Sequence, residues 1–136
     1  AFATAAQVAA ADLSALPMPG ARKAALAALA AASVADPRLF QANAGLEATL
    51  ARLRAIPGIG EWTADYIALR ALREPDAFPA GDLGLLRAAA ETEVRPEPRA
   101  LRRRAEPWRP WRAYAAQHLW TASATARKPA PEAVHG

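Results

Sequence analysis

The chain has 136 residues, of which 53% are hydrophobic and 22% charged, and its formal net charge is +4. This composition excludes a disordered chain, and a domain of this length can bury about two thirds of the surface that it exposes when unfolded. The absence of cysteine excludes disulfides, thiol nucleophiles and cysteine-ligated iron–sulfur clusters from this segment, and charged residues interrupt the alanine-rich runs before they reach the length of a membrane span.

Alanine-rich segments separated by prolines predict helices throughout the chain, because alanine has the highest helix propensity and proline interrupts helices. The predicted helices cover residues 4–11, 21–34, 45–55, 61–72, 83–91, 98–105 and, starting at Pro107 or Pro110, a last helix up to Ala122. Thr4 and Gln7 have the spacing of a capping box at the start of the first helix. We therefore expect an all-α fold.

A proline–glycine turn over residues 56–60 joins two of the predicted helices. Pro57 fixes φ and ends the first helix, while Gly58 and Gly60 permit positive φ and bring no Cβ into the turn. Backbone N–H groups are then exposed at the start of the second helix, with Thr63 in its first turn, and they can bind a phosphate oxygen. The alternative is an ordinary tight turn between two packed helices.

The segment from Leu53 to Ala64 resembles the helix-hairpin-helix element of DNA repair glycosylases, whose backbone amides bind a DNA phosphate without reading sequence. Non-catalytic DNA-binding proteins carry similar hairpins. This element by itself therefore predicts DNA binding only, and it does not indicate whether the protein is an enzyme.

An acidic residue, Asp82, stands at the predicted start of the helix over residues 83–91. The helix dipole and nearby N–H donors favour its charged form, so we expect it to be ionised at neutral pH. Aspartate is also a common helix N-cap with no further role. A third segment, from Trp108 to Trp120, is rich in aromatic and basic residues.

The hairpin, the Asp82 loop and the segment from Trp108 to Trp120, in this order and spacing, resemble the DNA-3-methyladenine glycosylase II family. This family is the alkylpurine branch of the helix-hairpin-helix DNA glycosylase superfamily, and the resemblance runs from about Phe2 to Trp120. It implies a compact helical domain of that type in which Asp82 is the catalytic aspartate.

The resemblance also implies roles for three groups of residues. The side chains expected to line the pocket for the damaged base are Trp62, Tyr66 and Trp120. The residues whose backbone would bind DNA phosphate are Gly58, Gly60 and Thr63. Backbone carbonyls that hold a monovalent cation in this superfamily would here belong to Arg54, Ile56 and Ile59. Apart from this structural cation, no cofactor is required.

The function implied is that of a DNA glycosylase in base excision repair, which hydrolyses the N-glycosidic bond of alkylated purines of the 3-methyladenine type flipped out of duplex DNA. Trp62 and Tyr66 are four residues apart, so they share one face of a helix and suit stacking and cation–π contact with a positively charged base. The alternatives are that these aromatics belong to the core, that the chain is a non-catalytic helix-hairpin-helix DNA-binding module, or that it is a helical interaction domain.

Two positions depart from relatives in the superfamily. Bifunctional members have a lysine where this chain has Trp62, so no Schiff base can form there and we expect no lyase activity. Leu86 stands where a polar or basic residue is expected, which implies that one DNA-facing or structural contact is absent.

Other charged residues have less specific interpretations. The arginines over residues 102–104 predict a solvated helix face that adds salt-dependent attraction to DNA. Arg109 and Arg112 are expected either to contact phosphates or to tie the last helix to the core. His118 is interpreted as a packed structural residue, because no aspartate or serine accompanies it in the motif.

We expect residues 1–125 to form the glycosylase domain, as the C-terminal part of a longer protein, and residues 126–136 to be a disordered tail. The expected partner is double-stranded DNA containing alkylated bases, with no membrane association. The expected state is a monomer in the bacterial cytoplasm, associated with the nucleoid through DNA, and the bias toward alanine and arginine is typical of a GC-rich genome.

Overall fold

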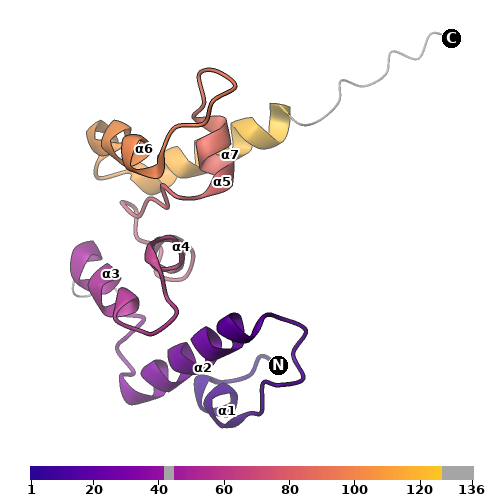
Figure 1. The fold of residues 1–136 in the computed structure, drawn as a ribbon. Helices are drawn as coiled ribbons and strands as arrows, with labels where there is room; N and C mark the ends of the chain where they lie inside the picture. Colours follow the sequence, from indigo (N-terminus) through magenta and orange to yellow (C-terminus); the bar gives the residue numbers. More distant parts are fainter. Residues whose placement is uncertain (42–44, 127–136) are drawn as a thin grey trace, which may run out of the picture. The chain divides into compact units, whose positions relative to one another are not determined.

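Eight helical elements and their connecting turns make up residues 1–41 and 45–126, the part of the chain that the computed structural model describes (Figure 1). The helices are α1 (Ala5–Ala10), α2 (Gly20–Ala35), α3 (Leu46–Arg54), α4 (Glu61–Arg70), α5 (Leu83–Ala88), α6 (Pro98–Arg104) and α7 (Arg112–Ala126), with a 3-10 turn η1 (Glu106–Trp108) before α7. The described residues contain no strand, so the predicted all-α fold is confirmed. The same residues contain no helix long and apolar enough to cross a membrane.

The chain divides into two compact units, Ala1–Glu74 and Pro75–Gly136. Ala126 is the last residue of α7, and residues 127–136 of the predicted tail lie outside the described residues.

The first unit contains α1 packed against α2, and α3 packed against α4 (Figure 1). The capping box at the start of α1 is formed as predicted: the Gln7 N–H donates to Thr4 Oγ1 at 3.2 Å, and the Thr4 N–H donates to Gln7 Oε1 at 2.8 Å. The leucines of α3 supply its buried face, where Leu50 and Leu53 are almost inaccessible. Apolar residues at helical spacing therefore place α3 against α4.

The turn between α3 and α4 approaches α2 closely at Gly58. Its φ is +86°, and a Cβ built on it would lie 2.7 Å from the Cβ of Ala25. A side chain here would require both a strained backbone and displacement of α2. Glycine is thus needed at this position for packing within the unit, independently of any ligand.

Replacing Gly58 by alanine is expected to lower the free energy of unfolding by about 1 to 3 kcal/mol, because the new methyl group overpacks against Ala25 in a strained backbone. Gly60→Ala is the matched control, since φ there is −85° and a Cβ would meet no atom within 4 Å beyond its chain neighbours. The control should lose at most about 0.5 kcal/mol in urea unfolding. Equal losses for the two variants would contradict the close approach.

The second unit is built around α7, which packs against α5 (Figure 1). The loop that precedes Asp82 is buried over residues 77–80, and the Phe78 ring meets the Trp108 ring edge-on with centroids 6.0 Å apart. The Ala113 N–H donates to the Pro75 carbonyl at 2.9 Å, which fixes the start of this loop on α7. The loop is therefore held by buried contacts, so the start of α5 has a defined position within the unit.

A cluster of ion pairs ties the start of α7 to the same loop. Arg112 is 2% exposed and binds Asp76 through two bonds, from Nε to Oδ1 at 2.8 Å and from a terminal nitrogen to Oδ2 at 3.1 Å. Arg109 donates to Asp76 Oδ2 at 3.1 Å and to Glu106 Oε2 at 3.0 Å. Of the two roles left open by the sequence, these contacts favour tying the last helix to the core.

Two helix boundaries differ from the prediction. The helix expected over residues 83–91 ends at Ala88, and Arg104 of α6 donates to the Ala89 carbonyl at 2.8 Å, just beyond this helix end. The last helix begins at Arg112, after η1, and continues to Ala126. The arginine that the sequence assigned to a solvated face at position 104 therefore has a structural contact.

Candidate active site

Asp82 is the N-cap of α5, as predicted. Its φ of −67° and ψ of 126° are extended, and Oδ1 accepts the Leu85 N–H at 3.0 Å. This bond is the usual N-cap interaction, in which a side-chain oxygen satisfies an N–H group of the first helical turn. The carboxylate is half-buried. It is therefore held in place without being closed off from solvent.

Trp120 of α7 contacts the same carboxylate. Its indole Nε1–H donates to Asp82 Oδ1 at 2.8 Å, across 38 positions in the sequence. The packing of α5 against α7 produces this contact. Two of the predicted site residues thus meet in the Pro75–Gly136 unit, through a hydrogen bond that the sequence did not predict.

Gly84 is a site residue that the sequence analysis missed. A Cβ built on Gly84 would lie 2.9 Å from Asp82 Oδ1 and 3.1 Å and 3.2 Å from the indole atoms Cδ1 and Nε1 of Trp120. These distances are shorter than ordinary contacts, so any side chain would displace the hydrogen-bonded pair. A signal was present, because glycine is unfavourable inside a short helix unless close packing requires it.

Trp62 and Tyr66 form an aromatic surface on α4, in the Ala1–Glu74 unit. Their rings stack with centroids 5.1 Å apart and an interplanar angle of 23°, which confirms that they share one helix face. Trp62 is 43% exposed, so it is not a core residue. The guanidinium of Arg70 lies 5.7 Å from the centroid of the Tyr66 ring, at cation–π distance.

The start of α4 supplies the backbone N–H groups of a helix N-terminus. Gly60 is the N-cap of α4, and as a glycine it has no side chain that could cap the helix. Thr63 is half-buried in the first turn of that helix. The first N–H groups of any helix lack partners inside the helix and carry partial positive charge. The backbone from Gly60 to Thr63 therefore has donors suited to a phosphate oxygen.

The carbonyls proposed for a cation belong to the C-terminal end of α3 and to the turn that follows it. Arg54 is the last residue of α3, and Ile56 and Ile59 follow in the turn, where the Ile59 N–H donates to the Ile56 carbonyl at 3.1 Å. Carbonyls at a helix C-terminus carry partial negative charge and have two lone pairs each, so this donor set fits a monovalent cation. In residues 1–41 and 45–126, no group of three or more acidic or histidine side chains could hold a metal ion.

His118 differs from its expected surroundings, and Leu86 is placed by the structure in a core. His118 is exposed, so its interpretation as a packed residue is wrong: successive helical residues are about 100° apart, and His118 is two positions from buried Ala116. Leu86 is 7% exposed and contributes to the core of its unit.

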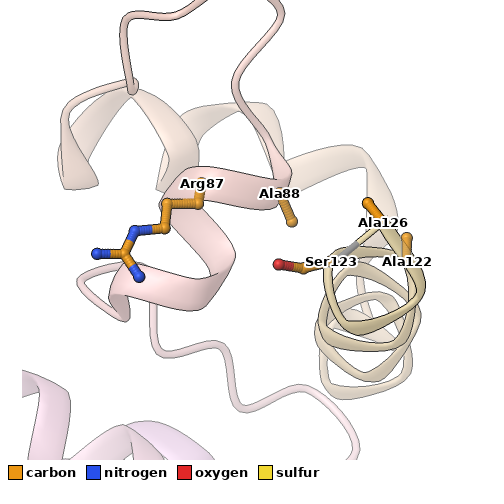
Figure 2. Close-up of a pocket in the computed structure, with 5 residues that line it drawn as sticks. All are labelled: Arg87, Ala88, Ala122, Ser123 and Ala126. Atoms are coloured by element: carbon orange, nitrogen blue, oxygen red, sulfur yellow. The ribbon is translucent and has the colours of Figure 1, made fainter. Parts of the chain in front are cut away.

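A hollow of about 360 Å³ lies beside α5 and α7. Its lining residues are Arg87, Ala88, Ala122, Ser123 and Ala126. Figure 2 shows Ser123 pointing toward α5, whereas the guanidinium of Arg87 extends away from α7. Neither Asp82 nor Trp120 lines this hollow, so it is separate from the candidate active site.

Comparison with known proteins gives relatives of one kind. The chain is 47% identical over 116 residues to the "Probable bifunctional transcriptional activator/DNA repair enzyme AlkA" of Mycobacterium tuberculosis. The matched region covers 85% of this chain and 23% of that protein. It is 38% identical over 122 residues to "DNA-3-methyladenine glycosylase 2" of Escherichia coli, covering 88% of this chain and 42% of that protein. The chain thus spans less than half of these relatives, and no protein-family model matches it.

A solved structure has the same fold. The Schizosaccharomyces pombe 3-methyladenine DNA glycosylase (Mag1), determined in complex with abasic DNA, matches with a TM-score of 0.82 and 24% identity, over 95% of this chain and 67% of that one. The resemblance predicted from the sequence is confirmed. Over most of its length this chain is a homologue of the DNA-3-methyladenine glycosylases, and it has the all-α fold of a DNA glycosylase.

Proposed function

We propose that this chain carries the catalytic part of a DNA glycosylase that removes alkylated purines of the 3-methyladenine type from duplex DNA. The observation that carries the proposal is the half-buried carboxylate of Asp82, held at the start of α5 by the Trp120 indole N–H at 2.8 Å. It occurs in a chain that is 47% and 38% identical to relatives named for DNA repair and 3-methyladenine removal.

The chemistry of the substrate suits a single carboxylate. Alkylation at a ring nitrogen gives the purine a positive charge, so the base leaves readily and needs little protonation by the enzyme. Bond cleavage then develops positive charge on the sugar. Asp82 would stabilise this charge or accept a proton from the attacking water, and the products would be the free base and an abasic site.

Recognition of the damaged base is assigned to the aromatic residues. Stacked rings with an exposed face, such as Trp62 and Tyr66, attract a flat cationic base more strongly than a neutral one. Trp120 would contribute a further aromatic surface beside the carboxylate. Selection for charge by aromatic stacking would explain a preference for alkylated over normal purines.

Binding to DNA is assigned to the hairpin. The backbone of Gly58, Gly60 and Thr63 would bind one phosphate, and the net charge of +4 would add a salt-dependent attraction. The carbonyls of Arg54, Ile56 and Ile59 would hold a monovalent cation that stiffens the turn. We also propose that the protein acts as a monomer on DNA in the bacterial cytoplasm.

Absence of lyase activity is part of the proposal. Trp62 occupies the position where bifunctional relatives carry a lysine, and an indole cannot form a Schiff base with the abasic sugar. The enzyme would therefore leave the DNA strand intact after removing the base.

The alternative is a helix-hairpin-helix module that binds DNA without catalysis. It accounts for the hairpin and for the positive charge. It gives no role to the Asp82–Trp120 hydrogen bond or to the stacked pair on α4, in which Trp62 is exposed. The glycosylase proposal accounts for all of these features.

An end-labelled duplex containing one 7-methylguanine tests both parts of the proposal. After incubation with the protein, we expect strand breaks only in the portion then treated at neutral pH with an endonuclease specific for abasic sites, because that enzyme cuts at abasic sites and leaves the methylated purine intact. Breaks without the endonuclease would show lyase activity and contradict the assignment of Trp62. Binding of the duplex without formation of abasic sites would support the DNA-binding module instead.

A further inference from the structure

Asp82 Oδ1 accepts hydrogen bonds from two different helices. The Leu85 N–H of α5 donates at 3.0 Å and the Trp120 indole of α7 donates at 2.8 Å. One bond to a carboxylate oxygen leaves the group free to turn about its own axis, whereas two donors from separate elements define its plane. Both bonds engage Oδ1, so the direction in which Oδ2 points is set by the packing of α7 on α5.

The indole is suited to holding an ionised carboxylate. Tryptophan Nε1–H is a donor only, so it bonds a carboxylate oxygen and offers no acceptor in return. A hydrogen bond to a charged acceptor is stronger than one to a neutral acceptor, and the separation of 2.8 Å is that of a well-formed hydrogen bond. The contact therefore does more than fill space beside the acid.

Gly84 leaves the space that this contact requires. The Cβ of any other residue would lie 2.9 Å from Asp82 Oδ1 and about as close to the indole, at 3.1 Å from Cδ1. Glycine lowers the stability of a helix, so its presence in the six-residue α5 has to be offset by another gain. The gain that the geometry offers is the close approach of Trp120 to Asp82.

We propose that Trp120 and Gly84 are positioning residues, which fix the orientation of the Asp82 carboxylate for cleavage of the glycosidic bond. This inference rests on the proposed glycosylase function and adds to it, because Trp120 then acts through its N–H on Asp82 as well as through its ring on the base. A wall of the base pocket would need only the ring. A substitution that removes the N–H and keeps an aromatic ring can therefore distinguish the two roles of Trp120.

Trp120→Phe removes the N–H and keeps an aromatic ring. We expect the single-turnover rate constant for base release to fall about 10- to 100-fold, since small misplacements of a catalytic group have effects of this size. The fall should be equal for 3-methyladenine and 7-methylguanine, and the dissociation constant for DNA should not change. An unchanged rate, or a loss confined to one of the two bases, would overturn the inference and leave Trp120 as a pocket wall.

A double-mutant cycle checks that Trp120 acts through Asp82. In an Asp82→Asn background, Trp120→Phe is expected to cause less than a threefold further loss, because two residues that act as a unit are not additive. The same 10- to 100-fold loss in both backgrounds would overturn the inference. No base release by the unsubstituted protein would overturn the proposed function, so the two failures are distinguishable.

Gly84→Ala provides a second variant in case Trp120→Phe does not fold. It should lower the rate of base release at least about tenfold by separating the indole from the carboxylate. Gly20→Ala is its matched control, because a Cβ at Gly20 would meet no atom within 4 Å. The indole N–H resonance of Trp120, identified by its loss in Trp120→Phe, should move in Asp82→Asn and in Gly84→Ala but not in Gly20→Ala. An unmoved resonance would contradict the contact directly.

Discussion

Replacing Asp82 by asparagine is expected to lower the rate constant for release of an alkylated purine at least about 100-fold, the size of effect seen when an electrostatic contact to a transition state is removed. Asparagine has the same shape, caps helices as well as aspartate does, and its amide oxygen can accept the bonds from Leu85 and Trp120. The substitution therefore removes the negative charge and retains the contacts. Single-turnover release of free base measures the effect.

The matched control for this variant is Asp36→Asn. The Asp36 carboxylate also accepts a local backbone N–H, from Arg38 at 3.0 Å, but it belongs to the Ala1–Glu74 unit and has no proposed role. Both variants should bind duplex DNA with the affinity of the unsubstituted protein, and the control should release base at the normal rate. If Asp82→Asn retained more than a tenth of the rate, the carboxylate would not be the catalytic group.

Replacing Arg112 by methionine is expected to lower the free energy of unfolding by about 3 kcal/mol, at the lower end of the range for breaking a buried ion pair. The Arg112 side chain is 3% exposed and that of Asp76 16% exposed, so removal of the guanidinium leaves a carboxylate away from water. The effect is at the lower end because Arg109 still pairs with Asp76 at 3.1 Å. Urea unfolding followed by circular dichroism measures it.

Arg109→Met shows how much of the loss in stability depends on burial of the ion pair. Arg109 contacts the same Asp76 carboxylate, but its side chain is 43% exposed, so the pair is screened by solvent and should contribute less than about 1 kcal/mol. Similar losses for the two variants would contradict the assignment of Arg112 as the residue that ties α7 to the loop before Asp82.

Local features of the fold could be predicted from the sequence because local chemistry determines them. The capping box of Thr4 and Gln7 and the N-cap at Asp82 depend on residues three positions apart, and both are formed as predicted. The shared face of Trp62 and Tyr66 follows from helical periodicity alone. The start of α7 was less well defined, since a 3-10 turn occupies the proline-containing segment from Glu106 to Trp108.

Contacts between distant segments could not be predicted in this way. The bond from Trp120 to Asp82 depends on how α7 is rotated against α5, and the periodicity of α7 does not fix that rotation, because buried Arg112 and Ala116 are not an apolar stripe. The choice of Arg112 between phosphate and an ion pair likewise depends on where the loop carrying Asp76 returns. Gly84 has a recognisable role only once both partners are in place.

The most direct test of the glycosylase proposal is chromatographic measurement of free 3-methyladenine released from methylated duplex DNA, with DNA binding measured in parallel. The proposal predicts first-order release well above spontaneous depurination, and loss of that release without loss of binding in Asp82→Asn. DNA binding with release no faster than the spontaneous rate would contradict it, and the hairpin would then be that of a DNA-binding module.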